Sequence, residues 1–124
     1  MNKKEAEAIK KRLRKIKAEK RPVIVKDING MEYIGFLTSF APLTYLRSVR
    51  DLVSIDIDKV FDRDGKTHLY VCTDAKIDDI RLSTEAEEKA YMELVDNEAE
   101  PINFFKFMSN KIYDVSGIFK SETE

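Results

Sequence analysis

The chain has 124 residues and a mass of 14.4 kDa, a size that predicts one compact domain and argues against a multidomain architecture. Hydrophobic residues make up 43% and charged residues 36%, and no apolar run reaches the about 18 residues of a membrane span, so we expect a cytoplasmic protein without membrane contact. With one cysteine and one histidine, the chain can form neither an intrachain disulfide nor a structural zinc site.

The net charge of −1 conceals a strong asymmetry along the chain. Residues 1–21 carry ten Lys and Arg against three Glu, a net of +7, whereas residues 83–124 carry four basic and ten acidic side chains, a net of −6. A basic segment can bind phosphate or an acidic protein surface, including the acidic third of its own chain or of a second copy. The charge pattern leaves these alternatives open.

A basic helix is predicted over residues 3–20. Its apolar residues follow a helical spacing, and Arg21-Pro22 ends it, because proline disfavours a helical residue before it and donates no amide. The apolar residues are Ala6, Ile9, Leu13 and Ile16. This narrow stripe indicates a helix that lies across a larger core. The cations on its polar side are Lys10, Lys11, Arg14, Lys15 and Lys17. They are the candidate nucleic-acid contacts, and pairing with the acidic C-terminal third is the alternative.

Five short strands are predicted between residues 22 and 82. The first two, over 22–28 and 31–40, flank Asn29-Gly30, which favours a type I′ hairpin turn. Gly35, within a strand that is apolar on both faces, suits a sharp bend. A connection over 41–51 follows. The later predictions are a strand over 52–58 that continues to Phe61, a turn at 62–65, a strand over 67–73 and a short strand over 77–82.

This arrangement of a basic helix, an Asn-Gly hairpin, a bent second strand and a closing Ile77-Asp78-Asp79-Ile80-Arg81-Leu82 resembles the Sm-like and SH3-like small β-barrels over residues 3–82. The resemblance implies a strongly bent, five-stranded antiparallel barrel with the N-terminal helix over one open end. As a fold analogy it also implies RNA binding. The Lys-, Glu- and Ile-rich composition resembles that of small proteins from low-GC bacteria and their phages.

The C-terminal third is predicted to be helical. Ser83-Thr84 is an N-cap signal, and the acidic residues after it favour a helix over 84–95. An acidic linker leads to a second helix, over 102–113, with more apolar surface than one helix face can bury. Such an excess is typical of a protein interface, although capping of the chain's own core is an equal alternative. The candidate partner-binding residues are Phe104, Phe105, Phe107, Met108, Ile112 and Tyr113.

We recognise no catalytic, metal-binding or cofactor-binding constellation in the sequence. Asp62 and Asp64 match two positions of a calcium loop whose first and last ligand positions are hydrophobic here, which indicates a solvated acidic turn. His68 and Cys72 lie four residues apart on a predicted strand, about 13 Å, too far for a catalytic dyad. We expect His68 at the surface and Cys72 to be buried.

The sequence therefore predicts an α+β protein with a basic N-terminal helix (1–21), a small barrel (22–82) and an acidic C-terminal helical region (83–124). We expect a non-enzymatic regulatory or inhibitor protein, encoded by a phage or mobile element, that binds another protein or itself through residues 102–113. The alternative is an Sm-like RNA-binding module that uses the basic helix. No cofactor is expected.

Overall fold

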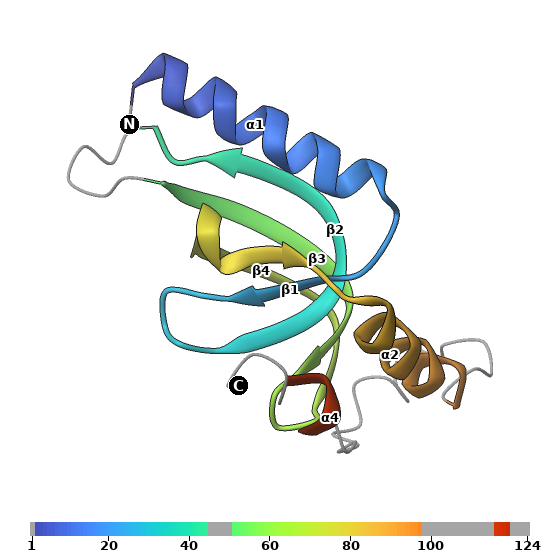
Figure 1. Ribbon diagram of the computed structural model, residues 1–124. Helices are drawn as coiled ribbons and strands as arrows, with labels where there is room; N and C mark the ends of the chain where they lie inside the picture. The colour runs from blue at the N-terminus through green and yellow to red at the C-terminus, as the bar shows by residue number, and fades with distance from the viewer. Residues whose placement is uncertain (1, 45–50, 98–115, 120–124) are drawn as a thin grey trace.

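The computed structural model describes residues 2–44, 51–97 and 116–119 (Figure 1). The elements are α1 (Lys3–Ala18), β1 (Val23–Lys26), β2 (Glu32–Pro42), β3 (Leu52–Asp62), β4 (Thr67–Lys76), the 3₁₀ turn η1 (Ile77–Asp79), β5 (Ile80–Leu82), α2 (Glu85–Asn97) and α4 (Ser116–Phe119). The five strands form one antiparallel sheet in the order β4-β3-β2-β1-β5. The predicted α+β class is confirmed, with a helix before the sheet and helical structure after it.

The last predicted strand is wrong in its first half. Residues 77–79 form η1, and only β5 pairs with β1. The cause is a change of partner at Ile77, whose amide donates to the carbonyl oxygen of Asp51 at 2.8 Å just after β4 stops pairing with β3. The chain thereby leaves one edge of the sheet and crosses to the other.

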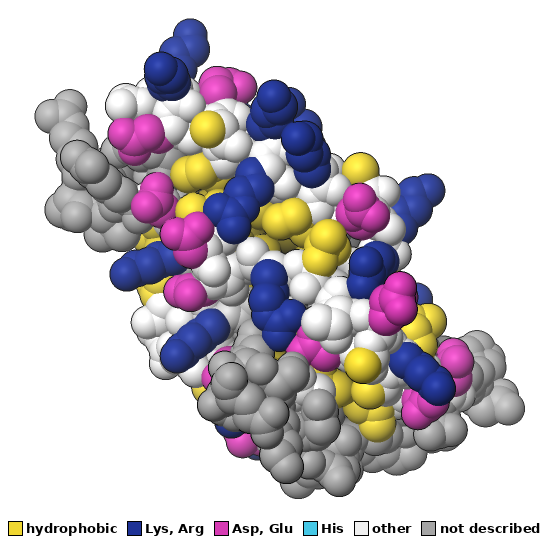
Figure 2. Space-filling view, viewed as in Figure 1, with side chains coloured by type: hydrophobic (Ala, Val, Ile, Leu, Met, Phe, Trp, Pro, Cys, Tyr) yellow, Lys and Arg dark blue, Asp and Glu magenta, His cyan; other side chains and the backbone are white. Residues whose placement is uncertain are grey.

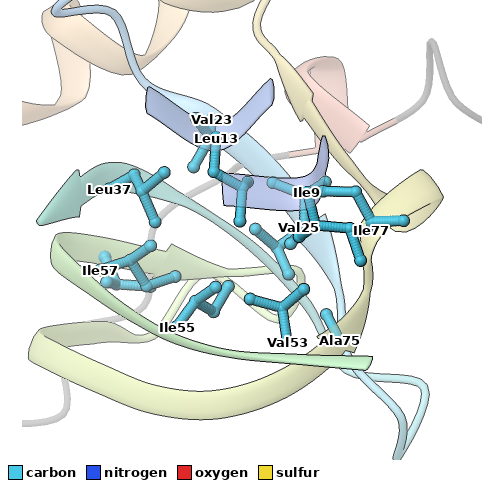
Figure 3. Packing of buried hydrophobic residues seen from close by; sticks show 12 residues of the cluster. Ile9, Leu13, Val23, Val25, Leu37, Val53, Ile55, Ile57, Ala75 and Ile77 are labelled. Carbon is cyan, nitrogen blue, oxygen red and sulfur yellow. The ribbon is translucent and has the colours of Figure 1, made fainter. Parts of the chain in front are cut away.

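The apolar side chains form two cores, one on each face of the sheet. In the first, Ile9 and Leu13 of α1 pack onto the sheet (Figure 3). Its strand residues include Val23, Val25, Leu37, Val53, Ile55, Ile57, Val60 and Ala75. The second core joins the other face to the C-terminal helices, and its members are Ile24, Ile34, Phe61, Tyr91, Ile118 and Phe119. Alternation along the strands lets β1 serve both cores. The expectation that α1 lies across a larger core is confirmed.

Gly35 lies where β2 bends against β3. A Cβ atom at this position would be 2.7 Å from the carbonyl oxygen of Asp58 and 3.1 Å from the side chain of Val60. The pairing register also shifts here, between Ile34 and Phe36. Only a residue without a side chain fits, so the bend predicted at Gly35 rests on this close approach, and β2 curves strongly in Figure 1.

The sheet is curled but open. Its two edges are β4 and β5, which do not pair with each other, so the structure does not show a closed barrel. The curl nevertheless brings the turn after β1 next to β4. There the amide of Ile28 donates a hydrogen bond to the carbonyl oxygen of Asp74 at 3.0 Å.

Two turns of the same kind close the two hairpins, β1–β2 and β3–β4. Residues 27–31 read Asp-Ile-Asn-Gly-Met and residues 62–66 read Asp-Arg-Asp-Gly-Lys. In each turn, Oδ1 of the aspartate accepts hydrogen bonds from the amides two and four residues later, at 2.9–3.0 Å. The described non-glycine residues with positive φ do not include Asn29, whereas Gly30 has φ 82° and Gly65 has φ 83°. The hairpin prediction is confirmed, but the type I′ turn is wrong, because the aspartate carboxylate organises a longer turn in which only glycine is left-handed.

Both long helices begin at side-chain caps. Asn2 Oδ1 accepts from the Glu5 amide at 2.8 Å, and at α2 Thr84 and Glu87 exchange side-chain to backbone hydrogen bonds in a capping box. The N-cap predicted at Ser83-Thr84 is thereby confirmed at Thr84. None of the helices in the described ranges combines the length and the apolar character that a bilayer crossing requires.

Candidate functional site

The cations of α1 project into solvent because the opposite side of the helix is committed to the first core. The buried residues share one stripe: Ala6, Ile9 and Leu13. Two residues along a helix correspond to a rotation of about 200°, so Lys11 and Lys15 point away from the sheet. Lys10, Arg14 and Lys17 follow one flank of the same helix. These five side chains are here called the basic face. Figure 2 shows Lys and Arg side chains along α1, with acidic side chains among them.

The ion pairs of α1 neutralise only part of this charge. Glu7 lies 3.6 Å from Lys10 and 4.0 Å from Arg14, and Asp78 of η1 lies 2.9 Å from Arg12. All these side chains are at least 42% exposed, and exposed ion pairs contribute about 0–1 kcal/mol each. Within the described ranges, no carboxylate forms an ion pair with Lys11, Lys15 or Lys17.

The acidic helix α2 contacts Arg21, in the short segment between α1 and β1, instead of the basic face. Nε of Arg21 lies 3.6 Å from Glu88, and the Arg21 guanidinium also donates to the carbonyl oxygen of Ser83 at 2.6 Å. In the part of the chain that is described, none of the five basic-face side chains forms an ion pair with the acidic third, and Arg21 is the only cation of residues 1–21 that does.

The predicted partner-binding residues Phe104, Phe105, Phe107, Met108, Ile112 and Tyr113 lie outside the described residues, as does the predicted helix over 102–113. The nearest described segment is α4, where Ile118 and Phe119 are buried against Tyr91 in the second core.

A polar cluster that the sequence analysis missed lies at the hairpin end of the sheet. Asp27 and Asp62 are both buried. The second oxygen of Asp27 accepts from the Thr73 hydroxyl at 2.9 Å, and that of Asp62 lies 2.9 Å from Nε2 of His68. Tyr33 belongs to the same cluster. Burial of its phenol raises the pKa of Tyr33, and the negative charges of Asp27 and Asp62 raise it further. The repeated Asp-x-Asn/Asp-Gly pattern was the available signal.

This cluster is built to hold the hairpins. In each aspartate, one carboxylate oxygen accepts hydrogen bonds from two turn amides, and the other oxygen contacts a side chain of β4. The expectation of a solvated turn is wrong for Asp62, because the turn amides and His68 draw its carboxylate inward.

Cys72 is exposed, so its predicted burial is wrong. Along β4, Val71 packs against the first core, and alternation therefore turns Cys72 to the other face. There the hydrogen bond to Asp56 raises the pKa of the Cys72 thiol. Hydrogen bonds from Ser39 and Cys72 lower the pKa of the Asp56 carboxyl.

Metal ligands are not gathered in the described ranges, where no group of three or more His, Cys, Asp or Glu side chains could hold an ion. Of the two sets of candidate site residues that the sequence predicts, only the basic face lies within the described ranges.

Comparison with family models, with curated proteins and with solved structures finds no match to this chain.

Proposed function

We propose that this protein binds a nucleic acid through phosphate contacts made by the basic face of α1. The observation that carries the proposal is that Lys11, Lys15 and Lys17 form no ion pair within the described ranges, on a helix whose opposite side is buried in the first core. A rigid row of exposed cations keeps its charge available to a polyanion.

The basic face is suited to a phosphate backbone more than to bases. At 16 residues α1 is about 24 Å long, enough to follow several phosphates. Its outer surface carries Lys and Arg but no aromatic side chain on which a base could stack. We therefore expect strongly salt-dependent binding with little sequence preference. The curl of the sheet and the helix before it support the resemblance to Sm-like barrels, which points to RNA first.

The test is the salt dependence of binding to a labelled single-stranded RNA. Lys11→Gln/Lys15→Gln/Lys17→Gln should weaken binding and reduce the slope of log K against log salt by about 2 to 3, because about 0.7–0.9 counterions are released per phosphate contact. The matched control is Lys26→Gln/Lys66→Gln/Lys89→Gln, which removes the same charge from exposed positions away from α1. Equal losses in both variants would show a net-charge effect and contradict the proposal.

A regulatory or inhibitor role through a protein partner, which the sequence analysis put first, is our second proposal, together with a phage or mobile-element origin. It rests on the density of apolar residues over 102–113, with three phenylalanines within four residues. Phe105→Asp should abolish binding of a protein partner and leave the circular dichroism spectrum unchanged. An unfolded variant would instead place Phe105 in a core. Affinity purification with and without nuclease separates this role from nucleic-acid binding.

A further inference from the structure

The β3–β4 hairpin exposes a sheet face that points away from α1. Alternation sends Val53, Ile55 and Ile57 into the first core, beneath α1, and turns the residues between them to the opposite face. The pairing register places Asp56 opposite Cys72, Asp58 opposite Tyr70 and Ser54 opposite Asp74. Tyr70 is 61% exposed, the largest value among the described large hydrophobic side chains.

This face is acidic. Here the acidic outer face denotes Asp56, Asp58, Asp74 and Tyr70. In residues 2–44, 51–97 and 116–119, no Lys or Arg forms an ion pair with its three carboxylates. Asp56 and Asp58 are same-face neighbours along β3, about 7 Å apart, and Asp74 on β4 lies diagonally across from Asp56, so the negative charges of the face add. Lys76, at the end of β4, follows the same alternation as Cys72 and Asp74.

The basic face and the acidic outer face cannot meet within one molecule. Leu13 is fully buried and holds α1 on the face of the sheet that carries Ile55 and Ile57. The three carboxylates project from the other face of the same strands, so the sheet separates the opposite charges. Two molecules can bring them together.

We propose that the basic face of α1 docks on the acidic outer face of a second copy of this chain. A second copy is the expected partner because the chain carries complementary charges on opposite sides of the sheet. Tyr70 adds an aromatic ring that an incoming lysine or arginine can stack on. The contact joins two different surfaces, so copies add head to tail into a ring or an open filament. Self-association goes beyond the proposed nucleic-acid binding. Where both occur, RNA and the second copy compete for the basic face, and this competition alone rests on the proposed function.

Sedimentation velocity of the full chain over a range of concentrations tests the proposal. At an ionic strength of about 0.01 M the weight-average mass should rise about twofold or more with concentration, and it should return to the monomer mass at about 1 M, where the Debye length is about 3 Å. Lys11→Glu/Lys15→Glu lowers the charge of the basic face from +5 to +1, and Asp56→Lys/Asp74→Lys changes that of the acidic outer face from −3 to +1. Each variant should be monomeric at low salt, because one of its two surfaces has lost the charge that docking requires.

The equimolar mixture of these two variants is the decisive sample. Each variant keeps one wild-type surface, the acidic outer face in the helix variant and the basic face in the sheet variant. These two surfaces can pair, so the mixture should form a heterodimer and its weight-average mass should rise up to about twofold. Lys66→Glu/Lys89→Glu, with the same charge change on other exposed positions, should associate as the wild type does. Asp58→Lys/Asp74→Lys replaces the sheet variant if circular dichroism shows that Asp56, which accepts from Ser39, does not tolerate lysine.

A mixture of folded variants that stays monomeric, or a wild type that is monomeric at low salt, overturns self-association. The outcome for nucleic acid is independent, because Asp56→Lys/Asp74→Lys retains the basic face and should bind RNA at least as tightly as the wild type. Association without RNA binding would overturn only the proposed function. RNA binding by a strictly monomeric wild type would overturn only this inference.

Discussion

Thr73 on β4 donates a hydrogen bond of 2.9 Å to the carboxylate of Asp27, which precedes it by 46 residues and lies just after β1. Beside it, the Ile28 amide donates to the Asp74 carbonyl oxygen at 3.0 Å. The two bonds fasten the turn of the first hairpin to the β4 edge, although no ladder joins β1 to β4. A buried carboxylate thus holds the curl of a sheet whose strands do not close.

Asp27→Ala should lower the free energy of unfolding by about 3 kcal/mol, because it leaves the amides of Asn29 and Met31 and the Thr73 hydroxyl without their acceptor. Urea unfolding followed by circular dichroism measures the change. Asp64→Ala, at an exposed position of the other turn, should change stability by less than about 0.5 kcal/mol. Equal midpoints for the two variants would show that Asp27 does not hold the curl.

Gly35→Ala should destabilise the fold by about 1–3 kcal/mol. The added Cβ atom would lie 2.7 Å from the Asp58 carbonyl oxygen, and a paired backbone cannot yield as a flexible side chain can. Gly30→Asn is the matched control, because position 30 is open and asparagine tolerates its φ of +82°. Thermal unfolding measures the stability of both variants. A Gly35→Ala protein as stable as Gly30→Asn would contradict the close approach of β3 to Gly35.

Alkaline pH should weaken the fold through Tyr91. Burial, and then the charge of Asp58, raises the pKa of the Tyr91 phenol above its ordinary value of about 10. The unfolded chain therefore loses this proton first, so the stabilisation is complete below about pH 10 and is lost as the pH rises further. Urea unfolding between about pH 8 and 11 should show this fall.

Tyr91→Phe should make that fall shallower. At neutral pH it should cost about 1–2 kcal/mol, since the phenol donates to the Lys59 carbonyl oxygen at 2.7 Å in the second core. Tyr70→Phe, at an exposed position, should leave both the stability and its pH dependence unchanged. An unaltered pH slope in Tyr91→Phe would assign the alkaline loss to other groups.

The local features of this fold were readable from the sequence because neighbouring residues determine them. The apolar stripe of α1, its end before Pro22, the cap at Thr84 and both hairpins depend on contacts within a few residues. The basic face was predicted for the same reason, since helical periodicity alone separates Lys11 and Lys15 from Leu13.

Other features depend on strand pairing, which joins residues far apart in the chain, and the sequence did not reveal them. The curl of the sheet and the turn amides bury Asp62 against His68, and the pairing of β3 with β4 turns Cys72 outward. The acidic outer face belongs to this class, because only the β3–β4 register places Asp74 opposite Ser54 and thus diagonally across from Asp56. The order of the residues is enough to show where the charges lie along the chain. The sheet, through the two faces that alternation creates, decided that the basic and the acidic surfaces look in opposite directions.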